Sequence, residues 1–92
     1  MMSKNVSFEN RDKFIQLGIA ISTLRRFRGI TQQDLARKIG VSRSTLQDIE
    51  NPNVIRSFSA DTFLKITYAL DVKADVLLNA SVFPDKILSN KK

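Results

Sequence analysis

The segment VSRSTLQDIEN, residues 41–51, includes four hydrogen-bonding side chains whose spacing suits one face of a helix: Arg43, Ser44, Gln47 and Asp48. In a helix, a step of about 100° per residue would place these four within an arc about 140° wide. Leu46 and Ile49 would point away from that arc, toward a core. An arginine can donate two parallel hydrogen bonds to guanine, and a glutamine can bind adenine in the same bidentate way. The pattern is therefore suited to contact with base edges in the major groove of DNA.

Each residue of this arc also has a purely structural interpretation. Arg43 could be a surface residue, but the helix dipole slightly disfavours a cation in the first turn, so we favour a base contact. We interpret Ser44 and Gln47 in the same way, with Gln47 reaching adenine or a phosphate. Asp48 is ambiguous, because phosphates repel a carboxylate that could nevertheless accept a hydrogen bond from cytosine. Thr45 lies at the edge of the arc and is interpreted as structural or as a sugar–phosphate contact.

Helix-capping residues predict the elements that would hold this arc. Thr31 is a suitable N-cap for a helix that Gly40 would end. The inner face of that helix would consist of Leu35, Ala36 and Ile39. Ser42 is a suitable N-cap for the next helix, which residues 51–53 (Asn-Pro-Asn) would stop. This second helix would span about 12 Å, close to the width of the major groove.

Three further helices are predicted around this pair. Upstream, a helical pattern runs from about Asp12 to Gly29, with an apolar stripe about 120° wide. The stripe consists of Phe14, Leu17, Gly18, Ile21 and Leu24. Downstream, Ser59 would cap a fourth helix, and a fifth would cover residues 74–78. Their inward side chains would be Phe63, Ile66, Leu70 and Leu77. Five helices without a convincing strand pattern predict an all-α fold.

The composition argues against several classes of function. A chain of 92 residues is suited to one small domain with little room for a deep pocket. It contains neither cysteine nor histidine, which removes thiolate chemistry, the usual general base and the commonest metal ligand. The nine acidic residues are dispersed, and the three glycines form no phosphate-binding loop. We therefore expect neither an enzyme nor a bound metal, cofactor or small-molecule ligand.

The net charge of +6 is unevenly distributed along the chain. Between residues 25 and 43, six cations face the single acid Asp34: Arg25, Arg26, Arg28, Arg37, Lys38 and Arg43. Between residues 57 and 90, three lysines face four aspartates. A basic half joined to a near-neutral half suggests a surface that meets a polyanion. A solvated cationic surface without a partner is the alternative.

The two ends of the chain are predicted to lie outside a domain of residues 12–78. Residues 1–11 carry no sustained period and are interpreted as a polar arm. The tail, residues 79–92, still holds the apolar residues Val82, Phe83, Ile87 and Leu88, which could pack on their own chain or contact a second subunit or another partner. No apolar run is long enough for a secretion signal or a membrane span, so we expect a cytoplasmic protein without a membrane partner.

Several motifs keep their spacing without a gap from Leu17 to Glu50. They are Leu17-Gly18, Arg25, Gly29-Ile30-Thr31-Gln32, Leu35-Ala36, Ile39-Gly40-Val41-Ser42 and Ile49-Glu50, followed by FLKITYAL at residues 63–70. In this combination, residues 14–78 resemble the helix-turn-helix domain of the phage repressor and Cro type. The resemblance implies a compact bundle of five helices, as in lambda repressor, that binds DNA as a two-fold dimer. It also implies a bacterial or phage protein associated with the nucleoid.

The resemblance implies roles for residues outside the polar arc. Gln32 matches a position that binds a phosphate and braces the recognition helix. Arg25 and Glu50 match a structural ion pair, and Arg25 falls within the apolar stripe of its helix, where an unpaired cation would be costly. In the family, the loop after the recognition helix contacts the DNA backbone, which makes phosphate ligands of Asn51, Asn53 and Arg56. Here that loop departs from the family pattern, because it contains Pro52 and is about two residues longer.

These observations predict a transcription regulator that binds double-stranded DNA in a sequence-specific way. We expect a homodimer on a palindromic operator, with residues 43–50 in the major groove, acting mainly as a repressor that blocks RNA polymerase or as an activator that contacts it. The alternative is the antitoxin of a toxin–antitoxin module, which would bind a toxin as well as DNA. A restriction-modification controller is a further candidate within the DNA-binding class.

Overall fold

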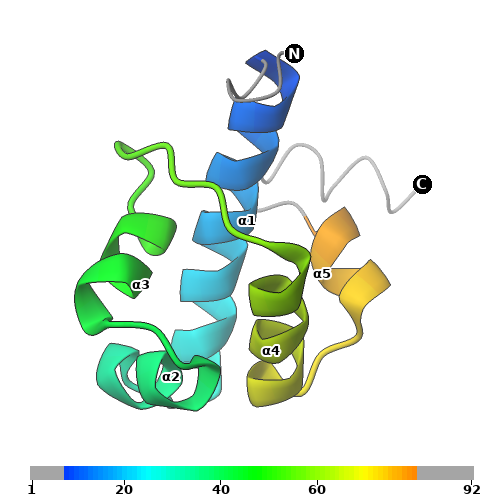
Figure 1. Ribbon diagram of the computed structural model, residues 1–92. Coiled ribbons are helices and arrows are strands. Elements are labelled where there is room, and N and C mark those ends of the chain that lie inside the picture. Colours follow the sequence, from blue (N-terminus) through cyan, green and yellow to red (C-terminus); the bar gives the residue numbers. More distant parts are fainter. Residues whose placement is uncertain (1–7, 81–92) are drawn as a thin grey trace.

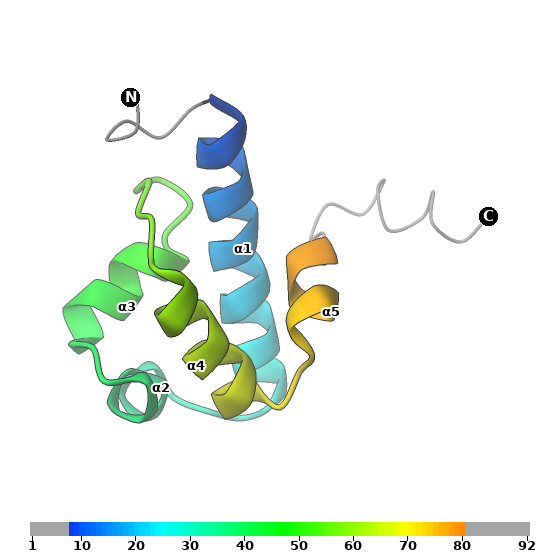
Figure 2. The same ribbon diagram turned by 45° about the vertical axis from the view of Figure 1, so that its right-hand side comes forward.

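The computed structural model describes residues 8–80, with side chains from residue 11 onward, and this part of the chain forms five α-helices and no strand. The helices are α1 (Phe8–Phe27), α2 (Gln32–Ile39), α3 (Arg43–Glu50), α4 (Ala60–Leu70) and α5 (Ala74–Asn79). The long α1 runs through the middle of the bundle, and α3 and α5 lie on opposite sides of it (Figures 1 and 2). The predicted all-α class is confirmed. No described helix is long and apolar enough to cross a membrane.

Two helix boundaries differ from the expected ones. The first helix begins at Phe8 rather than near Asp12, so residues 8–11 are helical although they were expected in a polar arm. Apolar periodicity reports only the part of a helix that packs on a core, and no glycine or proline interrupts the chain here. The last helix extends to Asn79, one residue beyond its predicted end. The apolar tail residues Val82, Phe83, Ile87 and Leu88 lie outside the described residues.

Three predicted N-caps are confirmed. Thr31 Oγ1 accepts a hydrogen bond from the backbone N–H of Asp34 at 3.0 Å. Ser42 Oγ accepts from the N–H of Thr45 at 3.0 Å. Ser59 Oγ accepts from the N–H of Thr62 at 3.1 Å. Each cap satisfies an N–H group that has no partner inside its helix, so the starts of α2, α3 and α4 are determined locally.

The helices α1, α2 and α4 end in the same way. A residue in the left-handed region follows each of them: Gly29 at φ 73°, Gly40 at φ 76° and Asp71 at φ 55°. The next residue donates its N–H to a carbonyl five positions back and packs an apolar side chain against the core: Ile30, Val41 and Val72. This is the Schellman arrangement, in which the apolar residue directs the chain back onto the protein. The turn from α2 to α3 is therefore anchored at both ends.

The core draws side chains from all five helices. Its fully buried members are Ile21 of α1, Leu35 and Ile39 of α2, Leu46 of α3, Ile66 and Leu70 of α4, and Leu77 of α5. At one end of the bundle, the rings of Phe14 and Phe58 meet edge to face, with centroids 5.1 Å apart. Because the pair α2–α3 shares this core with α1 and α4, it forms one rigid unit with the rest of the domain.

Candidate nucleic-acid interface

The short helix α3 separates its apolar and polar side chains on two faces. Leu46 and Ile49 are buried in the core. Arg43, Ser44 and Gln47 are exposed, as the predicted arc requires. Since the buried face cannot rotate outward without losing the core contacts, the exposed face has a fixed direction relative to the whole domain.

A close approach between α1 and α3 sets the position of that face. Gly18 of α1 lies against the backbone of α3, and a Cβ atom at this position would lie 2.0 Å from the carbonyl oxygen of Ile49. No side chain other than hydrogen fits in this space. The contact explains why a glycine stands within the apolar stripe of α1, a position where helix propensity alone disfavours it.

The ion pair expected between Arg25 and Glu50 is present and buried. Arg25 Nε donates to Glu50 Oε2 at 2.8 Å, and Nη2 donates to Oε1 at 3.0 Å. Arg25 Nη1 donates to the carbonyl oxygen of Ile30 at 2.7 Å. The side chains are only 10% and 4% exposed, respectively. This bidentate pair joins the C-terminal end of α1 to the C-terminal end of α3.

Gln32 extends this network to the start of α2. Its Nε2 donates to Glu50 Oε1 at 3.0 Å, so the side chain braces α3, in line with the role that the resemblance implied. An amide nitrogen carries two hydrogens, and one remains for a second acceptor. Gln32 is also the first residue of α2, where backbone N–H groups attract anions. Geometry and charge at this point are compatible with a phosphate.

Asp48 and Arg56 form an ion pair that the sequence did not indicate. Asp48 Oδ2 lies 3.7 Å from Arg56 Nη1, and the two side chains are 44% and 45% exposed. Arg56 belongs to the loop between α3 and α4, which brings a cation beside the carboxylate on the polar face of α3. The pair reduces the repulsion that an isolated carboxylate would exert on phosphates, because its negative charge has a nearby counter-charge.

The other candidate phosphate ligands take part in local hydrogen bonds. The hydroxyl of Thr45 accepts from Ser42 Oγ at 3.0 Å, beside the start of α3. Asn51 Oδ1 accepts from the backbone N–H of Asn53 at 2.9 Å, which shapes the turn after α3. Thr45 is half-buried, whereas both asparagines are exposed. Thr45 therefore borders the polar face of α3 near the start of the helix, and the two asparagines border it at the end.

Several cations of the basic run have local partners instead of forming one patch. Arg28 donates to the carbonyl oxygens of Leu70 and Asp71, at 2.9 and 3.1 Å, and so caps the end of α4. Arg37 pairs with Asp34 at 2.6 Å. Arg25 is buried with its own partner, as described above. From the sequence, all three cations were counted in the basic half of the chain, although Arg25 was already expected to pair with Glu50. For Arg28, no local signal indicates acceptors 42 and 43 residues further along the chain.

The comparisons with known proteins agree with this geometry. Residues 21–77 match a family model described as Helix-turn-helix. The antitoxin HipB of Escherichia coli is 35% identical over 68 residues, which cover 73% of this chain and 69% of HipB. The restriction-modification controller protein C.AhdI of Aeromonas hydrophila is 29% identical, with a TM-score of 0.65 over 72% of this chain and 97% of C.AhdI.

A second solved structure matches the fold more fully. The clp gene regulator ClgR of Corynebacterium glutamicum has a TM-score of 0.72 over 86% of this chain and 82% of ClgR, at 20% sequence identity. The matched region of the family model includes all of α2, α3 and α4 and most of α5, and therefore the whole polar face described above. The chain thus belongs to the helix-turn-helix family of DNA-binding transcription regulators.

Proposed function

We propose that this protein is a repressor that binds a palindromic operator as a homodimer, with α3 in the major groove of each half-site. One observation carries the proposal: α3 is held by the buried apolar residues Leu46 and Ile49, while three polar side chains project from its opposite face, those of Arg43, Ser44 and Gln47. A helix of eight residues spans about 12 Å, which fits the width of the groove. Two such helices, about 34 Å apart in a dimer, would contact successive turns of the duplex.

The candidate contacts divide into two kinds. Arg43, Ser44, Gln47 and Asp48 are proposed to contact bases, because they share the exposed face of α3. Gln32, Thr45, Asn51, Asn53 and Arg56 are proposed to contact phosphates, because they border that face. Phosphate contacts would set register and orientation, whereas base contacts would select the sequence. Repression would then follow from steric exclusion of RNA polymerase, in the cytoplasm, without any catalytic step.

Replacing Arg43 with alanine is expected to weaken operator binding by about 1–3 kcal/mol and to relax the preference at one base pair of each half-site. The reason is the loss of a bidentate contact to guanine. The measurement is a titration of operator and scrambled duplexes at one fixed salt concentration. Thermal stability should be unchanged or slightly higher, because Arg43 is exposed and the helix dipole disfavours a cation in the first turn of α3.

Arg26→Ala serves as the matched control, because Arg26 is also an exposed arginine but belongs to α1 and not to the polar face of α3. This control variant should keep the wild-type ratio of the affinity for the operator to the affinity for the scrambled duplex. If Arg43→Ala also kept that ratio, Arg43 would have no role in reading bases.

Binding is expected to weaken steeply as salt concentration rises. Neutralising about six to eight phosphates would give a slope of about −5 to −7 in a plot of log affinity against log salt, because counterions are released from DNA. Fluorescence anisotropy with a labelled operator at several potassium chloride concentrations measures this slope. A slope near zero would contradict an interface built on phosphate contacts.

A second candidate function is that of an antitoxin, and the similarity to HipB favours it. An antitoxin would bind a toxin protein in addition to its operator. Co-expression with the product of a neighbouring gene, followed by purification of this chain, would test the proposal. A stoichiometric complex would support the antitoxin function, whereas a chain that purifies without the product would leave repression as its sole proposed function.

A further inference from the structure

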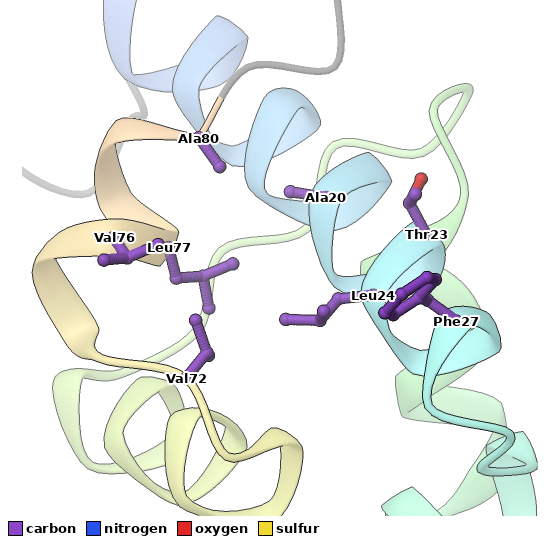
Figure 3. A pocket seen from close by; sticks show the side chains of 8 residues that line it. All are labelled: Ala20, Thr23, Leu24, Phe27, Val72, Val76, Leu77 and Ala80. Atoms are coloured by element: carbon purple, nitrogen blue, oxygen red, sulfur yellow. The ribbon is translucent and has the colours of Figure 1, made fainter.

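An open apolar cleft lies between the second half of α1 and the region of α5, with a volume of about 310 Å³ (Figure 3). From α1 it is lined by Ala20, Leu24 and Phe27, and from the α5 side by Val72, Val76 and Leu77. None of its lining residues carries a charge. A cavity of about 150 Å³ is enough to hold benzene, so the cleft has room for a phenyl ring.

The rim of this cleft exposes large apolar side chains. Phe27 is 80% exposed and Val76 is 52% exposed. Single exposed apolar residues are ordinary, but two of them beside an uncharged cleft form a contiguous apolar surface. Covering this surface would remove a phenyl ring and a branched side chain from water, which is the main source of association free energy in proteins.

We infer that a second copy of this chain covers the cleft, with Phe27 of each copy inserted into the cleft of the other. The inference rests on the homodimer of the proposed function and names its interface. In a two-fold interface the same patch meets itself, so a projecting side chain must find a recess within that patch. Phe27 supplies the projection, and the cleft that it borders supplies the recess.

The charge of the molecule bears on which face two copies can use. Each copy carries a net charge of +6, so two copies repel each other across most orientations. An uncharged apolar face is where they can approach with the least repulsion and the largest gain from burial. A second copy brings the exposed phenyl ring of Phe27, which the uncharged cleft has room to accept.

The position of the cleft also agrees with binding to two half-sites. In both views α3 and α5 lie on opposite sides of α1, so a dimer formed on the α5 side would keep both α3 helices outermost (Figures 1 and 2). A separation of about 34 Å requires each α3 to lie about 17 Å from the two-fold axis. This distance is smaller than even the shortest of the three extents of one chain, which are 38, 38 and 22 Å.

The test is the molecular mass of the full chain in solution, measured without DNA by analytical ultracentrifugation over a range of concentrations. The wild-type chain is expected to dimerise, and Phe27→Ser is expected to raise the dimer dissociation constant at least 100-fold. Tyr68→Ser is the matched control, because Tyr68 is an aromatic residue of α4 that is 89% exposed and does not line the cleft. It should dimerise like the wild type. A monomeric wild type would overturn the inference.

A mixing experiment tests the reciprocal insertion. Val76→Arg blocks the cleft but keeps Phe27, whereas Phe27→Ser keeps the cleft open. Each variant alone should be monomeric at a concentration where a one-to-one mixture forms heterodimers, because the mixture restores one of the two insertions. Absence of heterodimers would overturn the arrangement. These masses do not depend on DNA, so a failure here is distinct from a failure of sequence preference, which operator titrations measure.

Discussion

Arg25→Ala is expected to lower the free energy of unfolding by about 3–5 kcal/mol, the largest effect of any single substitution considered for this chain. The substitution leaves Glu50 as a carboxylate that is 4% exposed and has lost both of its hydrogen bonds to Arg25. Gln32 would remain as its one neutral donor. A charge in this position is strongly disfavoured, because neither water nor a counter-ion replaces the guanidinium. Urea denaturation followed by circular dichroism measures the change.

Two controls separate this pair from a general effect of arginine removal. Arg26→Ala removes the exposed neighbour and should change the free energy of unfolding by less than about 0.5 kcal/mol. The double variant Arg25→Met, Glu50→Leu removes both charges, and most of the lost stability should return, since apolar residues can replace a buried ion pair at little cost. Wild-type stability of Arg25→Ala would show that the pair contributes nothing to the fold.

Gly18→Ala is expected to destabilise the protein by about 1–3 kcal/mol, although alanine is the better helix former. Helix propensity by itself predicts a gain of about 0.5–1 kcal/mol. The added Cβ would lie 2.0 Å from the carbonyl oxygen of Ile49, whereas a carbon and an oxygen in contact lie about 3.3 Å apart. The backbone of α3 would have to move away from α1, because neither partner in the contact is a flexible side chain. The sign of the change in the free energy of unfolding therefore shows whether helix propensity or the steric contact with α3 is the larger effect.

The same displacement should reduce operator affinity, since it shifts the face that carries Arg43. Asp12→Ala, an exposed position on the same helix, is the control for helix propensity and should leave affinity unchanged. A Gly18→Ala variant that is more stable than the wild type would show that α1 and α3 do not approach as closely as described.

Much of the architecture could be predicted from local sequence signals. Thr31, Ser42 and Ser59 were identified as N-caps because a capping side chain binds N–H groups only a few residues away. The buried and exposed faces of α3 followed from the period of a helix, which depends on backbone geometry and not on distant residues. The start of α1 was missed by four residues, because residues 8–11 add about one turn to the helix without adding to the apolar pattern.

The pairing of Arg25 with Glu50 was expected only with help from the family resemblance. Periodicity indicated that Arg25 faces the core and must have a partner, but many carboxylates were available along the chain. The remaining phosphate and base contacts stay predictions, because they involve a molecule that lies outside the chain. The sequence thus indicates which face of α3 is polar, and experiments with DNA test which bases and phosphates that face contacts.

Only the tertiary structure decided which distant groups meet. Arg28 caps a helix 42 residues further along the chain, Arg56 lies beside Asp48, and Phe27 borders an open cleft. Local sequence determines helix starts, ends and faces, because these depend on hydrogen bonds and angles within a few residues. Contacts between helices depend on how the helices pack together, and packing is a property of the whole set of buried side chains, which no single segment contains.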